Sequence, residues 1–137
     1  MNQQRGNGQA PRAAETILVV EDEELLLELV QSLLESHGYT VLTARDGLSA
    51  VELFKQHSEQ IALVLTDLGL PKLDGGRASA QMKAINPKLK VIVATGYLDP
   101  EARGEMLQAG IHEFVHKPYF AAEILEKVKS LLKDNSG

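Results

Sequence analysis

The most informative stretch of the sequence is "VLTDLGLPKLDGG", residues Val64–Gly76, in which an apolar run is followed by a single acid, Asp67. Residues Ile61–Leu65 are apolar without a break, and Asp67 follows them at the entrance to a segment rich in glycine and proline. An uninterrupted apolar run of this length, bounded by turn residues, is typical of a buried strand. The sequence therefore places a carboxylate at the end of a buried strand, where it needs a partner or a function.

Short apolar runs of this kind alternate five times with segments of helical period. The runs are "TILVV" (16–20), "YTVLTA" (39–44), "IALVLT" (61–66), "KVIVAT" (90–95) and "HEFVH" (112–116). Strands that alternate with helices require right-handed crossovers, so they form a parallel sheet with helices on both faces. We therefore predict an α/β, doubly wound, flavodoxin-like (βα)5 fold, with a five-stranded parallel sheet of order 2-1-3-4-5.

The first helix is predicted from an apolar stripe behind the first strand. Leu26, Leu29, Val30 and Leu33 fall at i, i+3, i+4 and i+7, and Gly38 is a natural residue to end the helix. This spacing predicts that these four side chains face the sheet.

The later helices are predicted from caps and stripes. Asp46 is the expected cap of the second helix, and Asp74 of the third, which runs over 75–85 with a first turn weakened by glycine. The fourth helix is predicted over 99–109. The last helix has the clearest stripe, at Ala121, Ile124, Leu125, Val128, Leu131 and Leu132.

The chain has 137 residues, enough for one domain and too few for two ordinary ones. Residues 1–14, "MNQQRGNGQAPRAA", are polar, and we predict a flexible tail or a linker remnant there. The domain is predicted over 15–134, with a tail at 135–137. Because no output domain follows the last predicted helix, we expect the chain to act through partners or to be a piece of a longer protein.

The composition excludes several classes of function. A formal net charge of -5 argues against a nucleic-acid surface, and the absence of cysteine excludes disulfides and cysteine-based metal or redox sites. No apolar run approaches the roughly 20 residues that span a bilayer, and the amino terminus lacks the apolar core of a secretion signal. We therefore expect a cytoplasmic domain that makes no contact with a membrane.

The acids at the strand ends carry the chemistry. Glu21 and Asp22 end the first strand and Asp67 ends the third, and the predicted order makes these strands neighbours. Adjacent strands lie about 4.8 Å apart, so the carboxylates repel one another unless a cation lies among them. Hard oxygen ligands favour Mg²⁺ or a similar ion such as Mn²⁺. Thr95 and Lys117 at the ends of the fourth and fifth strands add a hydroxyl and a cation, which completes a phosphoryl-transfer site.

The same residues carry a resemblance to a known family. "VVEDE" (19–23), "TDLGLPKLDG" (66–75), "ATGY" (94–97) and "HKPY" (116–119) occur in this order, each at a predicted strand end. Together they resemble the receiver domain of bacterial two-component response regulators over roughly residues 16–133. The resemblance implies that Asp67 accepts a phosphoryl group from a kinase histidine.

The resemblance also implies the ligands of the metal. Asp22 and Asp67 would bind Mg²⁺ directly, Glu21 would bind it through water, and the backbone carbonyl of Gly69 would complete the protein ligands. Because the last ligand is a main-chain group, any residue type could supply it.

Lys117 would neutralise the phosphoryl oxygens, while the Thr95 hydroxyl and nearby backbone N–H groups around Gly96 would hold the charge that develops during in-line transfer. Pro118 resembles a family proline that is commonly joined to the lysine by a cis bond. The chain would thus catalyse its own phosphorylation and a slow dephosphorylation, without turning over a separate substrate.

Phe114 has two interpretations. It is either a plain core residue or the aromatic switch of the family, which moves inward when Thr95 is drawn towards the phosphoryl group. The switch would be read out on the face formed by the fourth helix, the fifth strand and the fifth helix. The histidines at 37, 57, 112 and 116 show no metal-ligand spacing, and we interpret them as surface or loop residues.

The partners implied are a histidine kinase or a histidine phosphotransfer domain as phosphodonor, and a downstream protein of unknown identity. A homodimer through the same helix 4, strand 5 and helix 5 face is a further expectation. The motifs also look like those of receivers at the carboxyl end of hybrid histidine kinases. Residue Gly69 offers no side chain to orient the water that hydrolyses the acyl phosphate, and Tyr97 can overhang that place, so we predict slow self-dephosphorylation.

Two other functions compete with this interpretation. A purely structural pseudo-receiver would not be phosphorylated, but such a module should lack part of the site. A Mg²⁺-dependent phosphatase or NTPase needs a phosphate-binding glycine loop or a second aspartate two residues after Asp67, and the sequence has neither. A dinucleotide site is excluded because acids replace the glycine-rich turn after the first strand.

Overall fold

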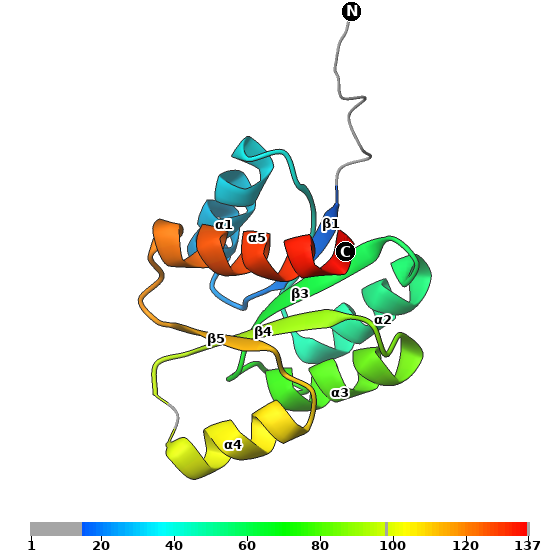
Figure 1. Cartoon of the computed structure of the whole chain (residues 1–137), viewed down its shortest axis with the longest axis vertical. Coiled ribbons are helices and arrows are strands. Elements are labelled where there is room, and N and C mark those ends of the chain that lie inside the picture. Colours follow the sequence, from blue (N-terminus) through cyan, green and yellow to red (C-terminus); the bar gives the residue numbers. More distant parts are fainter. Residues whose placement is uncertain (1–14, 98, 137) are drawn as a thin grey trace, which may run out of the picture.

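The computed structural model describes residues 15–97 and 99–136 (Figure 1). Its strands and helices alternate along the chain as β1 (Thr16–Val20), α1 (Glu24–Ser36), β2 (Thr40–Ala44), α2 (Gly47–His57), β3 (Ile61–Asp67), α3 (Gly75–Ile85), β4 (Lys90–Thr95), α4 (Pro100–Gln108), β5 (Glu113–His116) and α5 (Ala121–Ser136). The tail predicted at 1–14 lies outside the described residues. The last helix continues to Ser136, beyond the predicted domain end at 134.

The strands form one parallel sheet of order β2-β1-β3-β4-β5, which confirms the prediction. The three central strands, β1, β3 and β4, are apolar and rich in valine, leucine and isoleucine, as strands covered by helices on both faces are. The order along the sheet reverses between β1 and β3. At this reversal Val20 is paired with Thr66, so the residues that follow each strand emerge beside one another.

Alternating side chains of the strands feed two separate cores, because successive residues of a strand point to opposite faces. On one face Leu18 and Val64 pack with Phe54 of α2 and Met82 of α3. The other face is covered by α1 and α5, as Figure 1 shows. No helix among the described residues is long and apolar enough to cross a membrane.

The buried face predicted for α1 is wrong, because the helix buries a stripe that is shifted by one residue along the sequence from the predicted one. The buried side chains of this helix are Leu27, Val30 and Leu34, whereas Leu29 is 65% exposed. The segment is so rich in leucine that two phases of the helical period fit it equally well. Packing against the sheet selects the phase, and sequence spacing alone does not contain that information.

The caps predicted for α2 and α3 are confirmed. Asp46 accepts a hydrogen bond from the Ser49 N–H at 2.7 Å, and Asp74 accepts one from the Arg77 N–H at 2.9 Å. The helix α1 has no side-chain cap at Glu23. Its start is held instead by an acid of the site described next.

Candidate functional site

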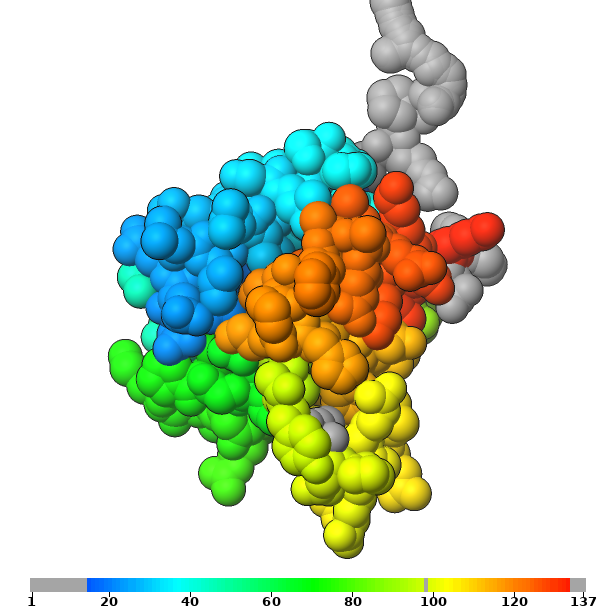
Figure 2. Space-filling view, turned by 90° about the vertical axis from the view of Figure 1, so that its left-hand side faces the viewer, coloured from blue at the N-terminus to red at the C-terminus, as the bar shows by residue number. Residues whose placement is uncertain are grey.

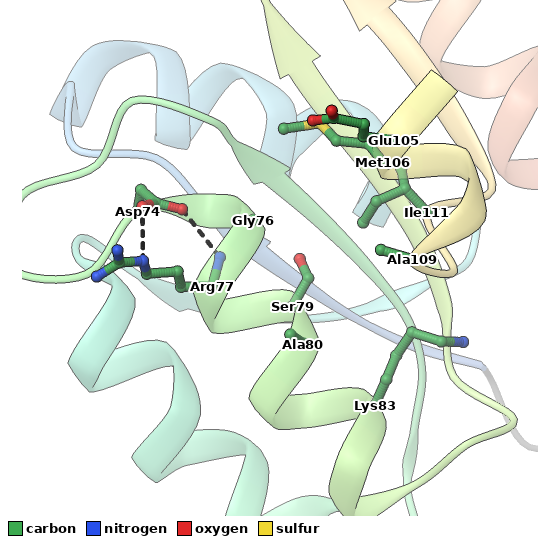
Figure 3. A pocket seen from close by; sticks show the side chains of 10 residues that line it. All are labelled: Asp74, Gly76, Arg77, Ser79, Ala80, Lys83, Glu105, Met106, Ala109 and Ile111. Carbon is green, nitrogen blue, oxygen red and sulfur yellow. Dashed lines mark hydrogen bonds and ion pairs between the residues drawn. The ribbon is translucent and has the colours of Figure 1, made fainter. Parts of the chain in front are cut away.

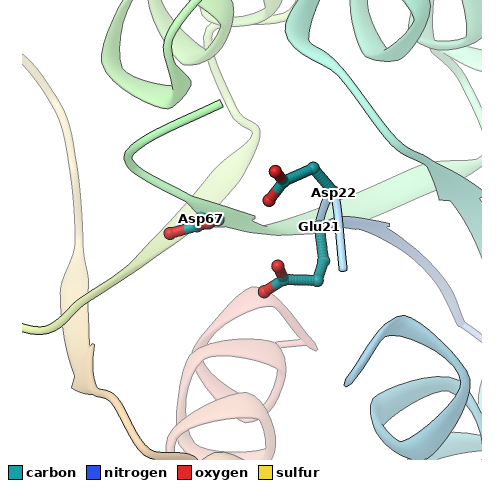
Figure 4. A group of neighbouring side chains, drawn as sticks. All are labelled: Glu21, Asp22 and Asp67. Atoms are coloured by element: carbon teal, nitrogen blue, oxygen red, sulfur yellow. The ribbon is translucent and has the colours of Figure 1, made fainter. Parts of the chain in front are cut away.

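The carboxylates of Glu21, Asp22 and Asp67 gather at the ends of β1 and β3, as predicted (Figure 4). Each of them offers an oxygen that lies within 4.8 Å of the others. Glu21 is 0% exposed and Asp67 7%, while Asp22 is half-buried. Acids that lose this much water at such a short separation need positive charge among them.

These acids pass a fit test for a small divalent cation. Two oxygens bound to one Mg²⁺ at about 2.1 Å lie at most about 4.2 Å apart, and a ligand that acts through water lies further out. The separation of up to 4.8 Å within the cluster suits this arrangement without a large movement of the backbone. The donors are all carboxylate oxygens, which is the ligand type that Mg²⁺ and Mn²⁺ prefer.

Lys117 lies between two of the acids. Its Nζ is 3.3 Å from Asp67 Oδ2 and 3.4 Å from Glu21 Oε1. The Lys117 N–H also donates to the Thr95 carbonyl at 3.0 Å, which fixes the chain beside β4. Burial lowers the pKa of the ammonium group, but the carboxylates of Asp67 and Glu21 outweigh burial and raise it. The lysine therefore stays positively charged at this site. The peptide bond between Lys117 and Pro118 is cis.

Glu21 is the most completely buried acid of the site. Its Oε2 accepts a hydrogen bond from the Glu23 N–H at 3.1 Å, which holds the start of α1. Its Oε1 accepts one from the hydroxyl of Tyr119 at 2.9 Å. Burial is the main reason why the pKa of Glu21 is raised, and the Glu23 and Tyr119 donors act against it.

Tyr119 is a residue of the site that the sequence analysis missed. It stands in the "HKPY" motif, two residues after the lysine, and its ring packs in the core between α1 and α5. Burial raises the pKa of its hydroxyl far above the ordinary value, and the neighbouring Glu21 charge raises it further, so the group stays a donor. The signal available in the sequence was its place in the "HKPY" motif, next to the predicted site lysine, but its contact with Glu21 is not visible there.

Gly69 lies in the exposed loop after β3, where a Cβ would meet nothing within 4 Å. Backbone hydrogen bonds of the neighbouring residue Leu68, and not contacts of Gly69, hold this loop in place. The Leu68 N–H donates to the Ala94 carbonyl at 2.9 Å, and the Gly75 N–H donates to the Leu68 carbonyl at 2.9 Å. The loop could therefore carry a side chain at position 69 without a change of course.

Thr95, at the end of β4, makes its side-chain hydrogen bond within its own loop. The Thr95 hydroxyl donates to the carbonyl of Tyr97 at 3.0 Å, so it is engaged within its own loop. Tyr97 is 78% exposed and Gly96 is also exposed. The hydroxyl is near the rim of the sheet, as predicted, but it must turn to serve a group on Asp67.

Phe114 is 2% exposed and belongs to the core on the α2 and α3 face. The guanidinium carbon of Arg103, on α4, lies 4.7 Å from the centre of its ring. The ammonium group of Lys127 on α5 bonds the Phe114 carbonyl and lies 3.2 Å from a carboxylate oxygen of Glu113. The ring thus occupies the inward position, and its role as a switch stays a prediction.

His112 is a loop residue, as predicted, but it directly precedes β5 and has a structural role there. This residue is half-buried. Its ring Nδ1 accepts a hydrogen bond from the backbone N–H of Val91 at 3.1 Å, and its backbone N–H donates to the Val91 carbonyl at 2.9 Å. Burial lowers the pKa of the ring, and the charges of Lys83 and Lys90 lower it further. A neutral imidazole therefore extends the pairing of β4 and β5.

Two of the surface hollows lie between neighbouring helices. One, of about 580 Å³, lies between α1 and the start of α5, which are side by side in Figure 2 (blue and orange), and it borders the acids only through Tyr119. The other, of about 370 Å³, lies between α3 and α4 (Figure 3). Its lining includes the Asp74 and Arg77 ion pair but none of the clustered acids, so it is not part of the candidate site.

The chain matches the family model of the response regulator receiver domain over residues 17–129. It is 30% identical over 120 residues to the chemotaxis protein CheY of Bacillus subtilis, and it covers 98% of that protein. It is also 33% identical to the alkaline phosphatase synthesis transcriptional regulatory protein PhoP of B. subtilis and 36% identical to a cyclic di-GMP phosphodiesterase of Thermotoga maritima. The chain spans only 48% and 27% of the length of these two relatives.

Solved structures give the same result. A response regulator receiver domain protein from Clostridium thermocellum matches with a TM-score of 0.83 at 30% identity, over 89% of this chain and 97% of that one. The CheY of a CheX-CheY-BeF3-Mg²⁺ complex from Borrelia burgdorferi matches with a TM-score of 0.82 at 26% identity, over 86% of this chain and 89% of that one.

Proposed function

Because this chain belongs to the response regulator receiver family of two-component systems, we propose that it is a phospho-accepting signalling domain in which Asp67 takes a phosphoryl group from a partner's histidine. One observation carries the proposal. Asp67 lies at the end of β3, nearly buried, with the Lys117 cation 3.3 Å from its carboxylate and two further acids beside it.

The transfer forms a bond between a carboxylate oxygen of Asp67 and phosphorus. The bond between phosphorus and the imidazole nitrogen of the donor breaks, and the nitrogen keeps that electron pair and then binds a proton. Burial limits the positions that the carboxylate can take, which favours an in-line attack. The acids repel an anionic donor, so the step needs the positive charge that the site supplies.

Lys117 supplies part of that charge. Its ammonium group already lies at hydrogen-bonding distance from Asp67 Oδ2, where it can follow the phosphoryl oxygens as they arrive. Thr95 would leave the Tyr97 carbonyl and donate its hydroxyl to a phosphoryl oxygen. The N–H groups of the loop around Gly96 would add further donors.

The acid cluster fits Mg²⁺ or Mn²⁺; Asp22, Asp67 and the Gly69 carbonyl would bind this cation directly, and Glu21 would bind it through water. When bound, this cation neutralises the acids and part of the phosphoryl charge. The clustering of the carboxylate oxygens of Glu21, Asp22 and Asp67 supports the proposal that these three acids share one cation.

The phosphodonor would be a histidine kinase or a histidine phosphotransfer domain. The downstream partner would read the face of α4, β5 and α5, on which Arg103, Phe114 and Lys127 already connect the three elements. A homodimer through this face is part of the same proposal. The CheX-CheY complex of B. burgdorferi is an example of a related domain bound to a partner protein.

The proposal is tested by incubating the protein with Mg²⁺ and acetyl phosphate, followed by intact mass measurement. We expect a mass gain of one phosphate that hydroxylamine removes, and its loss in Asp67→Asn. Asp74→Asn, which changes a helix-capping acid outside the cluster, should gain the phosphate like the parent. A parent protein that gains none, with Mg²⁺ present, would be a pseudo-receiver and the proposal would fail.

A further inference from the structure

We propose that Tyr119 is a positioning residue of the acid site, whose hydroxyl holds the Glu21 carboxylate so that Lys117 is left for the phosphoryl group on Asp67. The inference rests on the proposed function, because it concerns the use of the same site. It assigns a role to a residue that the phosphoryl transfer described above does not involve.

The first argument is the solvation of Glu21. This side chain is 0% exposed, so donors from the protein must replace the water that its carboxylate has lost. The donors are the Glu23 N–H at 3.1 Å, the Tyr119 hydroxyl at 2.9 Å and the Lys117 ammonium at 3.4 Å. The tyrosine hydroxyl is the shortest of these contacts, and it shares Oε1 with the lysine.

The second argument is the position of Lys117. Its Nζ is almost equally far from Glu21 Oε1, at 3.4 Å, and from Asp67 Oδ2, at 3.3 Å. A cation between two carboxylates moves towards the one that is less well satisfied by other donors. If the Tyr119 hydroxyl were absent, the lysine would be the last side-chain donor to Glu21 Oε1, and it would be drawn away from Asp67.

The third argument is that Tyr119 is itself held in place. Its ring packs against the core of the α1 and α5 face, and the Lys117 ammonium lies 5.6 Å from the centre of the ring. A ring fixed by packing presents its hydroxyl in one direction at little entropic cost. Partners that orient a metal-binding acid in this way commonly change metal affinity when they are removed.

The test compares Tyr119→Phe with the parent protein and with Tyr39→Phe, which makes the same change at a part-buried tyrosine of the same core. Isothermal titration calorimetry with MgCl2 gives the affinity, and acetyl phosphate gives the phosphorylation rate. We expect Tyr119→Phe to bind Mg²⁺ more weakly, on the order of tenfold, and to be phosphorylated more slowly. The control should stay within about twofold of the parent, because Tyr39 precedes β2 and lies at the opposite end of the parallel strands from the acids.

The same substitution in a Glu21→Gln variant shows whether the loss of Mg²⁺ affinity depends on the contact between Tyr119 and Glu21. In Glu21→Gln the charge that the hydroxyl holds is gone, so adding Tyr119→Phe should change Mg²⁺ affinity much less than it does in the parent. An equal loss in both backgrounds would assign the effect to ring packing and overturn the inference. Unchanged Mg²⁺ affinity in Tyr119→Phe would also overturn it.

The two proposals fail separately. A parent protein that binds Mg²⁺ but takes no phosphate would overturn the proposed function, while the calorimetry would still decide the role of Tyr119. A parent that binds no Mg²⁺ would overturn both. If Tyr119→Phe does not fold, Tyr119→Leu also removes the hydroxyl while it keeps an apolar side chain and all three acids, and it must then show the same weaker binding.

Discussion

At the scale of single residues, the site depends on a close approach of the backbone at Gly75. A Cβ at this position would lie 2.1 Å from the carbonyl oxygen of Asp67, a contact that no real side chain makes. The first residue of α3 therefore touches the last residue of β3. The glycine that weakens the helix in isolation is required to seat it against Asp67, the proposed phosphoacceptor.

We predict that Gly75→Ala destabilises the protein by about 2–3 kcal/mol, because overpacking moves the backbone of Asp67. Urea unfolding measures the change. Gly104→Ala is the matched control, because this glycine of α4 has nothing within 4 Å of its Cβ and alanine there should stabilise the helix by up to about 1 kcal/mol. Equal stabilities for the two variants would contradict the prediction.

Gly69 gives the second prediction at this scale. Since its Cβ would meet nothing, an asparagine fits there and can help to orient a water molecule towards a phosphoryl group on Asp67. One new hydrogen bond of about 1.4 kcal/mol in the transition state would shorten the phosphate lifetime of Gly69→Asn about tenfold. The lifetime is followed by intact mass after the donor is removed.

Gly69→Ala adds bulk without a polar group and should keep the slow dephosphorylation of the parent. A lifetime of Gly69→Asn equal to that of the alanine variant would show that the missing side chain is not the cause. The companion role predicted for Tyr97 would require its exposed ring to fold back over the loop, and Tyr97→Ala tests that movement.

At the scale of elements, His112 joins β4 and β5 through an acceptor that protonation removes. Its pKa is lowered by burial and by the charges of Lys83 and Lys90, so the unfolded chain binds the proton more readily than the folded one. The stability contributed by the neutral ring is therefore complete above the unfolded pKa of about 6.5 and is lost as the pH falls through the folded value.

We predict that the free energy of unfolding of the parent falls relative to that of His112→Asn between pH 7.5 and 5.5, by at most about 1.4 kcal/mol per pH unit. The asparagine keeps an acceptor near the place of Nδ1 and does not titrate. Subtracting the variant removes the contributions of Glu21 and of the other histidines. A difference that does not change with pH would refute the role of His112.

The elements also show what sequence reasoning can reach. Strand positions followed from short apolar runs between turn residues, because a strand buried on both faces has a simple composition. The strand order followed from the commoner topology of five-stranded doubly wound folds. The buried face of α1 did not, since its many leucines satisfy two helical phases and only contact with the sheet separates them. Asp46 and Asp74 were predicted because a cap acts within three residues of its own sequence.

The site divides in the same way. Acids that end strands are visible in the sequence, and strand order brings Glu21 and Asp67 together. Tyr119 was missed because its hydroxyl acts on a residue 98 positions away, through a side-chain direction that no local pattern encodes. The sequence also does not show that the Thr95 hydroxyl donates to the Tyr97 carbonyl, because that bond depends on the conformation of the loop.

At the scale of the whole molecule, the acid cluster opposes the stability of the fold. The formal net charge is -5, and three of the acids are crowded at one edge of the sheet, where Lys117 lies beside Glu21 and Asp67. Functional sites often keep such unfavourable charges, and removing one of them commonly stabilises the protein. A bound divalent cation would offset the repulsion and add binding free energy to the folded state.

Asp22→Asn separates these contributions. Without Mg²⁺ we expect the variant to unfold at a higher temperature than the parent, by the equivalent of about 1 kcal/mol, because one half-buried charge of the cluster is gone. With 10 mM Mg²⁺ the parent should gain about 2.7 kcal/mol if its Kd is about 0.1 mM, whereas the variant should gain almost nothing. The two melting curves would then exchange their order when the metal is added.

Asp74→Asn is the control for this exchange. Asparagine caps a helix about as well as aspartate, and position 74 lies outside the acid cluster, so this variant should keep the full Mg²⁺ response of the parent. If Asp22→Asn also kept that response, the metal would bind elsewhere or without this ligand. Binding of Mg²⁺ would then not explain why the protein keeps three mutually repelling acids at this edge of the sheet.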